Sequence, residues 1–275
     1  MQTYELVAFD LDGTLLRPDS SLSDYAIDVL RAINRRGVKI VPCTGRHYGG
    51  ALIHMRRIGV DTPGVFCNGA QLRTSLGGHI LDECPLLLDD AREAIRIGLE
   101  MGGHPRVYMN DRVYVSSVNE EDRGYAQRTG SIIEPVGDLL AFLDKGSPIV
   151  LKTINKIINV MPDLESVPLI FERSRCFFDG KKVYITQSLS TFVEYMHSWA
   201  TKGKGLKKLA GRWGIPKEKI LVAGDHFNDL TMFEEAGFSI APQNAQDVVR
   251  EAASCVCPGN AEDGVPQKLS EIFDI

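Results

Sequence analysis

The chain has 275 residues and a formal net charge of −5 at neutral pH. This length allows one large domain or two modest ones, and the acidic balance disfavours a nucleic-acid partner, which would need a basic surface. No apolar run approaches the roughly 18 residues of a membrane-spanning helix, and acids near the start argue against a secretory signal. None of the six cysteines forms a CxxC pair, so we expect reduced thiols in a cytoplasmic protein.

The first predicted strand, residues 5–9, runs directly into two carboxylates, Asp10 and Asp12, followed by Gly13. A polar turn is the simple alternative, because Asp and Gly are ordinary turn residues. An EF-hand loop does not fit, since Gly13 comes only three residues after Asp10 and the twelfth position is Ser21. Two neighbouring buried carboxylates need a cation or hydrogen-bond donors to offset their repulsion. Other strand ends must therefore supply partners if this is a site.

Strands and helices then alternate up to about residue 69. Ser23 is placed to cap a helix that ends at Gly37, and a second helix, residues 48–58, is closed by Gly59. The intervening strands, residues 38–42 and 65–67, end at Thr44-Gly45-Arg46 and at Asn68. Such alternation is typical of a parallel sheet with right-handed crossovers.

From about residue 82 the pattern changes to hairpins with interspersed helices. We predict helices over residues 89–101 and 164–173, strands over 149–154 and 156–161, and hairpins of 106–109 with 112–115 and of 175–178 with 182–186. Alternation returns after residue 191, with strands 220–223, 238–241 and 254–257 and helices near 202–213, 230–236, 245–252 and 265–273. The expected fold is therefore α/β, with residues 1–82 and 191–275 forming one parallel-sheet core and residues 83–190 inserted as an α+β domain.

Polar groups of matching chemistry follow several of the core strands. Ligands of open parallel sheets bind outside the carboxyl ends of the strands, where Asp10, Asp12, Thr44, Gly45, Asp225, Asn228 and Asp229 are expected, with Lys202 at a helix start. Four acids at one edge would repel unless a divalent cation lies among them, and oxygen ligands suit Mg²⁺. Hydroxyl, amide and ammonium groups suit a phosphate dianion. The combination predicts metal-assisted phosphoryl transfer, although each motif alone also fits a plain turn, a solvated lysine or a helix cap, and Lys204 rivals Lys202.

In combination these motifs carry a resemblance to a known family. Asp10-x-Asp12-Gly-Thr, Thr44-Gly-Arg, Lys202-Gly and Gly224-Asp-x-x-Asn-Asp229 resemble, in order and strand context, the four motifs of the haloacid dehalogenase-like (HAD) phosphohydrolases. The insert, with Asn68-Gly-Ala70 and Asp263-Gly-Val265, is similar to the Cof-type subfamily and its C2 cap. The resemblance implies a three-layer, Rossmann-like core with an α+β cap domain.

The resemblance also implies a role for each motif residue. Asp10 would be the nucleophile that forms an aspartyl-phosphate, and Asp12 the general acid and base, its pKa raised by the crowded acids. Mg²⁺ would be held by the side chains of Asp10 and Asp225 and the main-chain carbonyl of Asp12. Phosphoryl-binding roles fall to Thr44, Gly45, Lys202 and Asn228, while Asp229 would orient Lys202.

The implied activity is hydrolysis of a small phosphorylated metabolite, which we expect to be a sugar phosphate, by a monomer or homodimer. Arg46, His47 and Asn68 are candidates for contacting the substrate, whereas His226 is expected to be a bystander. The other five histidines lack the spacing of metal ligands; they are His47, His54, His79, His104 and His197. Two alternatives stay open: a phosphosugar mutase, and a non-catalytic protein that binds phosphometabolites.

Overall fold

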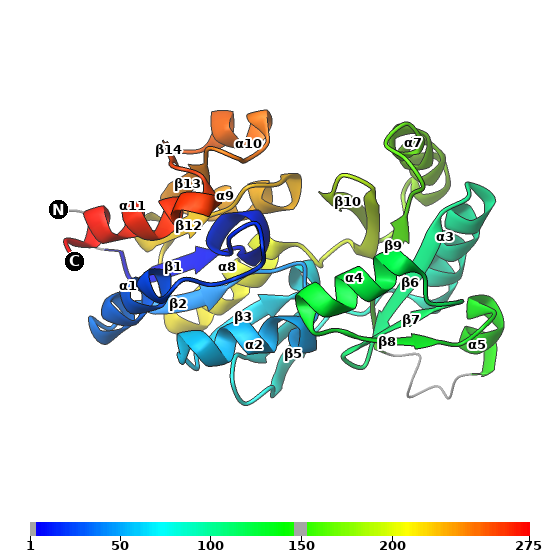
Figure 1. Cartoon of the computed structure of the whole chain (residues 1–275), viewed down its shortest axis with the longest axis horizontal. Coiled ribbons are helices and arrows are strands. Elements are labelled where there is room, and N and C mark those ends of the chain that lie inside the picture. Colours follow the sequence, from blue (N-terminus) through cyan, green and yellow to red (C-terminus); the bar gives the residue numbers. More distant parts are fainter. Residues whose placement is uncertain (1–3, 146–152) are drawn as a thin grey trace. The chain divides into compact units, whose positions relative to one another are not determined.

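The computed structural model describes residues 4–145 and 153–275, which divide into two compact units (Figure 1). One unit contains the described residues up to Asp82 together with Thr201–Ile275, and the other is Glu83–Ala200. The predicted return to the core at residue 191 is ten residues too early. Residues Phe192–His197 form strand β11, which pairs with β9 and β10 in the sheet of the second unit.

The first unit, the core unit, is built on a five-stranded parallel sheet in the order β14-β13-β12-β1-β2. Its strands are β1 Leu6–Phe9, β2 Lys39–Pro42, β12 Ile220–Ala223, β13 Phe238–Pro242 and β14 Cys255–Cys257. From β1 the chain crosses to β2 on one side, whereas β12 lies on the other side of β1. The strand order therefore reverses between β1 and β12, which is where ligands of such sheets bind.

Helices cover both faces of this sheet and make three layers (Figure 1). One face packs on α1 Asp24–Arg35, α2 Tyr48–Ile58 and α11 Gly264–Phe273; the other packs on α8 Lys202–Trp213, α9 Leu230–Phe233 and α10 Asp247–Ala252. Alternation along β1 explains this arrangement, because Val7 and Phe9 enter one core while Leu6 and Ala8 enter the other. The expected three-layer α/β fold is confirmed.

Local signals place the helix ends as predicted. The Ser23 side chain accepts a hydrogen bond from the Ala26 backbone N–H and caps α1, while Gly59 adopts φ +72° and ends α2. The strand predicted at residues 65–67 differs from the prediction in its bounds and in its pairing. It becomes β3 (Pro63–Phe66), which pairs antiparallel with β4 (Gln71–Thr74) in a small sheet with β5 (Ile80–Glu83). Only one parallel bridge, Cys43–Val65, joins it to the segment after β2.

The second unit, the inserted unit, contains a six-stranded sheet in the order β10-β11-β9-β6-β7-β8. Its strands are β6 His104–Met109, β7 Arg112–Val115, β8 Ile132–Pro135, β9 Ile154–Val160, β10 Val183–Leu189 and β11 Phe192–His197. Its helices are α3 Leu88–Glu100, α4 Glu120–Thr129, α5 Leu139–Lys145 and α7 Ser166–Phe178. The pairings are antiparallel except for β7 with β8, which confirms an α+β insert.

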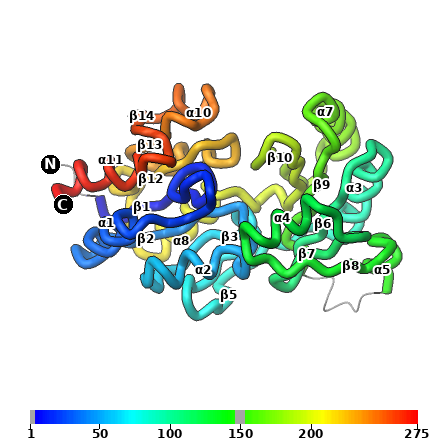
Figure 2. The backbone as a smooth tube through the Cα atoms, in the orientation of Figure 1, coloured from blue at the N-terminus to red at the C-terminus, as the bar shows by residue number. Residues whose placement is uncertain are grey.

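The two predicted hairpins of this unit have opposite outcomes. Asn110 and Asp111 both adopt positive φ, 54° and 59°, and join β6 to β7 as predicted. The hairpin predicted around Asp179-Gly180 is wrong, because residues 175–178 complete helix α7 and the true hairpin joins β10 to β11 (Figure 2). Ser174 and Phe178 continue the buried helical stripe of Val167 and Ile170, so burial overrides the local preference of an aromatic pair for strand. The predicted strand 149–154 lies mostly outside the described residues.

Two general expectations can be compared directly with the structure. All six cysteines are free thiols. Across the described ranges, the helices are too short or too polar to cross a bilayer.

Candidate active site

The site begins at the turn that follows β1. The Asp10 backbone N–H donates to Ala223 O of β12 at 3.0 Å, and the chain then turns through Leu11–Leu15. Gly13 adopts φ +76° there, and a Cβ added to it would lie 2.2 Å from Asp225 Oδ2. Glycine is therefore needed both for the left-handed turn and for the close approach of Asp225.

Lys202 lies at the start of α8 and is fully buried between two carboxylates. Its Nζ is 3.0 Å from Asp10 Oδ2 and 2.7 Å from Asp229 Oδ1. The second carboxylate oxygen of Asp229 accepts hydrogen bonds from the backbone N–H groups of Asp225 and His226, at 2.9 and 3.0 Å. Asp229 thus fixes both the lysine and the loop after β12. Lys204, the rival lysine, is exposed.

Three carboxylates gather around this lysine. Oxygen atoms of Asp10, Asp225 and Asp229 lie within 4.8 Å of one another. Burial raises the pKa of Asp10 well above its ordinary value, with the charges of Asp229, Asp225 and Asp12 adding to that effect and Lys202 opposing it. Burial, followed by the Asp229 charge, raises the pKa of Asp225 to about 7. For Lys202, burial would lower the pKa, but the charges of Asp10 and Asp229 outweigh it and raise the pKa.

The donor set of this cluster fits a divalent cation. Asp10 Oδ1 is buried and has no hydrogen-bond partner among the described residues, whereas Asp225 Oδ1 accepts from the Thr14 hydroxyl at 2.6 Å. Hard oxygen ligands whose mutual repulsion raises their pKa are the groups that Mg²⁺ or a similar ion stabilises. Residues Asp10 and Asp225 could hold such an ion, while Asp229 is occupied by its lysine and backbone donors.

Asp12 has a different partner from the other acids. Arg46 binds it with two hydrogen bonds, Nε to Oδ2 at 2.7 Å and Nη2 to Oδ1 at 2.6 Å. Burial would raise the pKa of Asp12, but the hydrogen bonds and charge of Arg46 outweigh burial and lower it. The expected upward shift from crowded acids is therefore wrong, because the carboxylate is turned to the guanidinium.

Arg46, a candidate for contacting the substrate, is only 4% exposed, and besides binding Asp12 it donates to Gly50 O at 3.0 Å. The Arg46 Nη1 atom also lies 3.2 Å from Nε2 of His54, which is one helical turn after Gly50 in α2. Burial and then the Arg46 charge lower the pKa of His54 to about 4, so the neutral ring accepts this hydrogen bond. His54 is not among the site residues predicted from the sequence, although a helix that starts at Tyr48, two residues after Arg46, turns positions 50 and 54 back towards it.

The remaining predicted residues form a connected set of loops. Asn68 is fully buried, with its N–H donating to Thr44 O at 3.0 Å and its side-chain oxygen accepting from Asn228 Nδ2 at 2.9 Å. A Cβ at Gly45 would lie 3.2 Å from the same Asn68 oxygen. Asn68 adopts φ +54°, a left-handed conformation that its surroundings enforce. It therefore joins the loops after β2, β3 and β12.

Two predicted histidines lie near these loops. His47 is 3% exposed and immediately precedes α2. His226 follows Asp225, and its ring packs edge-to-face against Phe227 at a centroid distance of 5.1 Å.

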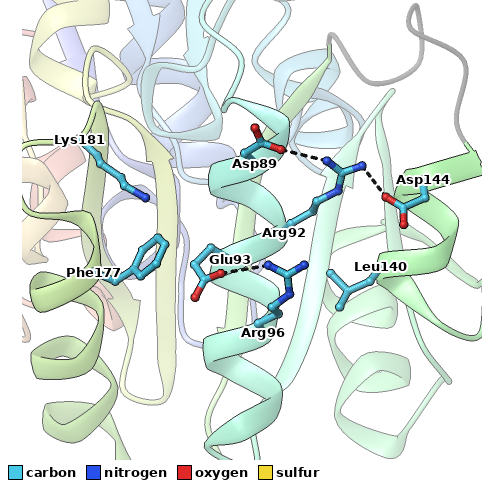
Figure 3. A pocket seen from close by; sticks show the side chains of 8 residues that line it. All are labelled: Asp89, Arg92, Glu93, Arg96, Leu140, Asp144, Phe177 and Lys181. Carbon is cyan, nitrogen blue, oxygen red and sulfur yellow. Dashed lines mark hydrogen bonds and ion pairs between the residues drawn. The ribbon is translucent and has the colours of Figure 1, made fainter.

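A cavity of about 390 Å³ lies elsewhere, between α3, α5 and α7 of the inserted unit (Figure 3). It is lined by Asp89, Arg92, Glu93, Arg96, Leu140, Asp144, Phe177 and Lys181. Arg92 is paired with Asp89 and Asp144, Arg96 with Glu93, and Lys181 lies over the Phe177 ring at 3.7 Å. The charged side chains that line this cavity are already matched, and none of the motif residues lines it. The carboxylate cluster of the core unit is therefore the better candidate site.

Comparisons with known proteins agree with the fold and the motifs. A family model described as haloacid dehalogenase-like hydrolase matches residues 7–269. The chain is 29% identical to the 5-amino-6-(5-phospho-D-ribitylamino)uracil phosphatase YitU of Bacillus subtilis, with 98% of each chain covered. It is 26% identical to the pyridoxal phosphate phosphatase YbhA of Escherichia coli, with 96% of this chain and 97% of that protein covered. A crystal structure from Thermotoga maritima superposes with a TM-score of 0.79 at 27% identity, covering 98% of this chain and 97% of the other.

Proposed function

The chain belongs to the haloacid dehalogenase-like hydrolase family, and from this premise we propose that it is a Mg²⁺-dependent phosphatase of small phosphorylated metabolites. The observation that carries the proposal is the state of Asp10. One of its oxygens is bound to Lys202, and the other is buried without a hydrogen-bond partner among the described residues. A carboxylate oxygen that no protein donor occupies keeps its lone pairs available for a metal ion or for attack on phosphorus.

In the first half of the reaction, a carboxylate oxygen of Asp10 attacks the phosphorus atom in line with the leaving alcohol. A bond forms between this oxygen and phosphorus while the bond from phosphorus to the alcohol oxygen breaks. This step uses the protonated form of Asp12, so the carboxylate must leave its ion pair with Arg46 and take up a proton as substrate binds. Asp12 then gives that proton to the departing oxygen, which leaves as a neutral alcohol. The product on the enzyme is an aspartyl-phosphate at position 10.

In the second half, water replaces the aspartate. Asp12, now a carboxylate, takes a proton from the water as its oxygen attacks phosphorus, and the bond to Asp10 breaks to release inorganic phosphate. The bidentate contact with Arg46 favours this ionised form of Asp12. Both side chains return to their starting state.

Phosphoryl oxygens would be bound by the Thr44 hydroxyl, the Gly45 amide, the Lys202 ammonium and the Asn228 side chain. Lys202 is held in place by Asp229 at 2.7 Å, so little reorganisation is needed when negative charge develops. When bound, Mg²⁺ would neutralise phosphate charge and orient the ester for attack. The side chains of Asp10 and Asp225, with the main-chain carbonyl of Asp12, would hold it. Asn68 supports this set by fixing Asn228 and the loop of Thr44.

The substrate class that we propose is a phosphate monoester of a small metabolite, with a sugar phosphate as the first choice. Two relatives carry names that specify a phosphoribitylamino-uracil and pyridoxal phosphate, and all three kinds of compound carry phosphate on a small organic alcohol. The free thiols are compatible with the proposed cytoplasmic location.

A phosphate-release panel tests the proposal. Purified protein with Mg²⁺ is assayed against sugar phosphates, pyridoxal phosphate and the phosphoribitylamino-uracil, with EDTA and an Asp10→Asn variant as controls. We expect free phosphate from at least one class, dependent on the metal and lost in the variant. Transfer of phosphate between substrate hydroxyls without release would identify a mutase, and tight binding without turnover would identify a sensor.

A further inference from the structure

Four residues from outside the four catalytic motifs hold the turn that carries Asp12. Arg17, Asn244, Asn260 and Asp263 are here called the turn clamp. We propose that the turn clamp positions Asp12 for proton transfer to the leaving alcohol. The inference rests on the proposed function, because it assigns a purpose to residues around the general acid of that reaction.

Two asparagines of the clamp bind the backbone of the turn. Asn244 Nδ2 donates to Gly13 O at 2.8 Å, and Asn260 Nδ2 donates to Leu16 O at 2.7 Å. The asparagines are also joined to each other, since Asn244 Oδ1 accepts from the Asn260 backbone N–H at 2.8 Å. The carbonyl groups on both sides of Thr14 are thereby fixed by one connected pair of side chains.

Arg17 and Asp263 close the clamp where the chain leaves the turn. Arg17 donates from Nε to Asp263 Oδ1 at 3.2 Å and from Nη2 to Oδ2 at 2.5 Å. Asp263 is 6% exposed and adopts φ +57°. A non-glycine residue in this conformation persists only where its surroundings over-determine it. The next residue, Gly264, leaves no room for a side chain, since a Cβ there would lie 1.7 Å from Pro258 O.

The same segment reaches the second acidic loop. The Gln246 N–H donates to Asp225 O at 3.0 Å, two residues after Asn244. The Thr14 hydroxyl donates to Asp225 Oδ1 at 2.6 Å from the opposite side. The parallel sheet explains the convergence, because the loops after β13 and β14 emerge at the same edge as Asp10 and Asp225.

Asp12 depends on this support more than Asp10 does. Asp10 is anchored in the sheet through its N–H and buried beside Lys202. The side chain of Asp12 is 44% exposed, and Arg46 is its side-chain hydrogen-bond partner among the described residues, so its backbone position is set by the turn itself. A misplacement of about 1 Å is enough to cost a catalytic group on the order of a hundredfold in rate. Loosening the clamp should therefore impair proton donation by Asp12 more than it impairs attack by Asp10.

Leaving-group chemistry separates these two effects. An alkyl phosphate releases a strongly basic alkoxide that needs the proton from Asp12, whereas p-nitrophenyl phosphate releases a stable phenolate that does not. The value of kcat/KM reports the steps up to transfer of phosphate to Asp10. For Arg17→Ala and for Asn244→Ala, we expect kcat/KM to fall about tenfold or more with the best alkyl phosphate and less than about threefold with p-nitrophenyl phosphate. Arg17→Lys should recover part of the loss.

Arg36→Ala is the matched control. Arg36 also joins an early helix to the end of the chain, by donating to the carbonyls of Phe273 and Asp274, but does not contact the turn. The Arg36→Ala variant should leave the ratio of kcat/KM for the alkyl phosphate to kcat/KM for p-nitrophenyl phosphate unchanged. Circular dichroism verifies folding, and Asn244 is exposed, so its replacement leaves no buried gap.

The outcomes are separable from those of the proposed function. Equal losses on both substrates, or no loss on either, would overturn the role of the turn clamp while leaving the phosphatase intact. A wild-type protein that releases phosphate from neither substrate would instead overturn the proposed function.

Discussion

The core unit and the inserted unit both bury cations against carboxylates, but they balance the charges differently. In the inserted unit, Arg106 is fully buried, binds Asp122 through Nε at 2.8 Å and also pairs with Glu121. Its guanidinium lies over the rings of Tyr125 and Phe192, at 4.9 and 5.2 Å. Lys156 and Glu194 form a second pair there, one cation to one anion, at 2.7 Å.

In the core unit the acids outnumber the cation. Lys202 is shared by Asp10 and Asp229, with Asp225 beside them. The pKa values of Asp10 and Asp225 are raised there, whereas the pKa of Asp122 is lowered, because its hydrogen bonds to His104 and Asn119 and the charge of Arg106 outweigh its burial. Matched buried charges support a fold. A buried excess of one sign is unfavourable until a ligand completes it, and this marks a functional site.

Asp10→Asn gives the largest expected effect and tests this contrast directly. Turnover should fall more than about 10³-fold, because the amide is a poor nucleophile. Stability in EDTA should be unchanged or higher, since a buried charge opposed by its neighbours is removed. Phosphate release and thermal melting measure the two effects. Asp24→Asn, an exposed acid on α1, is the control and should change neither.

Arg106→Leu should have the opposite effect to Asp10→Asn, because it should lower the stability of the fold rather than turnover. Removing one member of a buried ion pair leaves Asp122 with His104 and the Asn119 N–H but without its guanidinium, and we expect a loss of about 3–5 kcal/mol in the free energy of unfolding. Denaturant titration measures it. Arg96→Ala removes an exposed pair with Glu93 and should cost less than about 1 kcal/mol. Equal effects of the two variants would mean that the buried network does not support the unit.

The sequence predicts the core unit well for physical reasons. Strands buried on both faces are short apolar runs, and their ends carry the motifs, so Asp10, Lys202, Asp225 and Asp229 are brought together as the order of elements implies. The inserted unit is harder to predict, because some of its strands, such as β8 and β10, are only partly buried, and local propensity competes there with tertiary contacts. The residues 175–178 show this competition, since their aromatic pair suits a strand but completes α7.

Orientation of the side chains is what the sequence does not contain. Arg46 follows Gly45 in a phosphate-binding motif, and only the structure turns its guanidinium to Asp12. The turn clamp depends on contacts between residues more than 200 positions apart, such as Arg17 and Asp263. No local pattern specifies such a contact without the arrangement of the strands.

Metal removal should make stability depend on pH. The pKa of Asp225 is raised to about 7 in the folded core unit, so protonation of this carboxyl group favours the folded state. The resulting gain in the free energy of unfolding is fully present below about pH 4 and is lost as the pH rises through about 7. The melting temperature in EDTA should therefore fall by several degrees between pH 5 and 8. Mg²⁺ should reduce the dependence of the melting temperature on pH, and so should the Asp225→Asn substitution. Identical slopes with and without metal in the wild type would contradict the interpretation that the excess acids await a cation.

The smallest expected effect concerns Asp12, the active-site acid that is matched by a guanidinium, that of Arg46. Burial would raise its pKa, and Arg46 lowers it instead, so in Arg46→Leu the pKa should rise by about one unit or more. Ionised Asp12 is the base for hydrolysis of the aspartyl-phosphate, so the acidic limb of kcat should move to higher pH by that amount. An activated aryl phosphate, for which this step limits turnover, is the substrate for the pH profile. Arg46→Lys keeps the charge without the bidentate contact and should give an intermediate shift. An unmoved limb in Arg46→Leu would show that the ionisation of Asp12 is set by the metal and the other carboxylates, and the matched pair would then be structural, like those of the inserted unit.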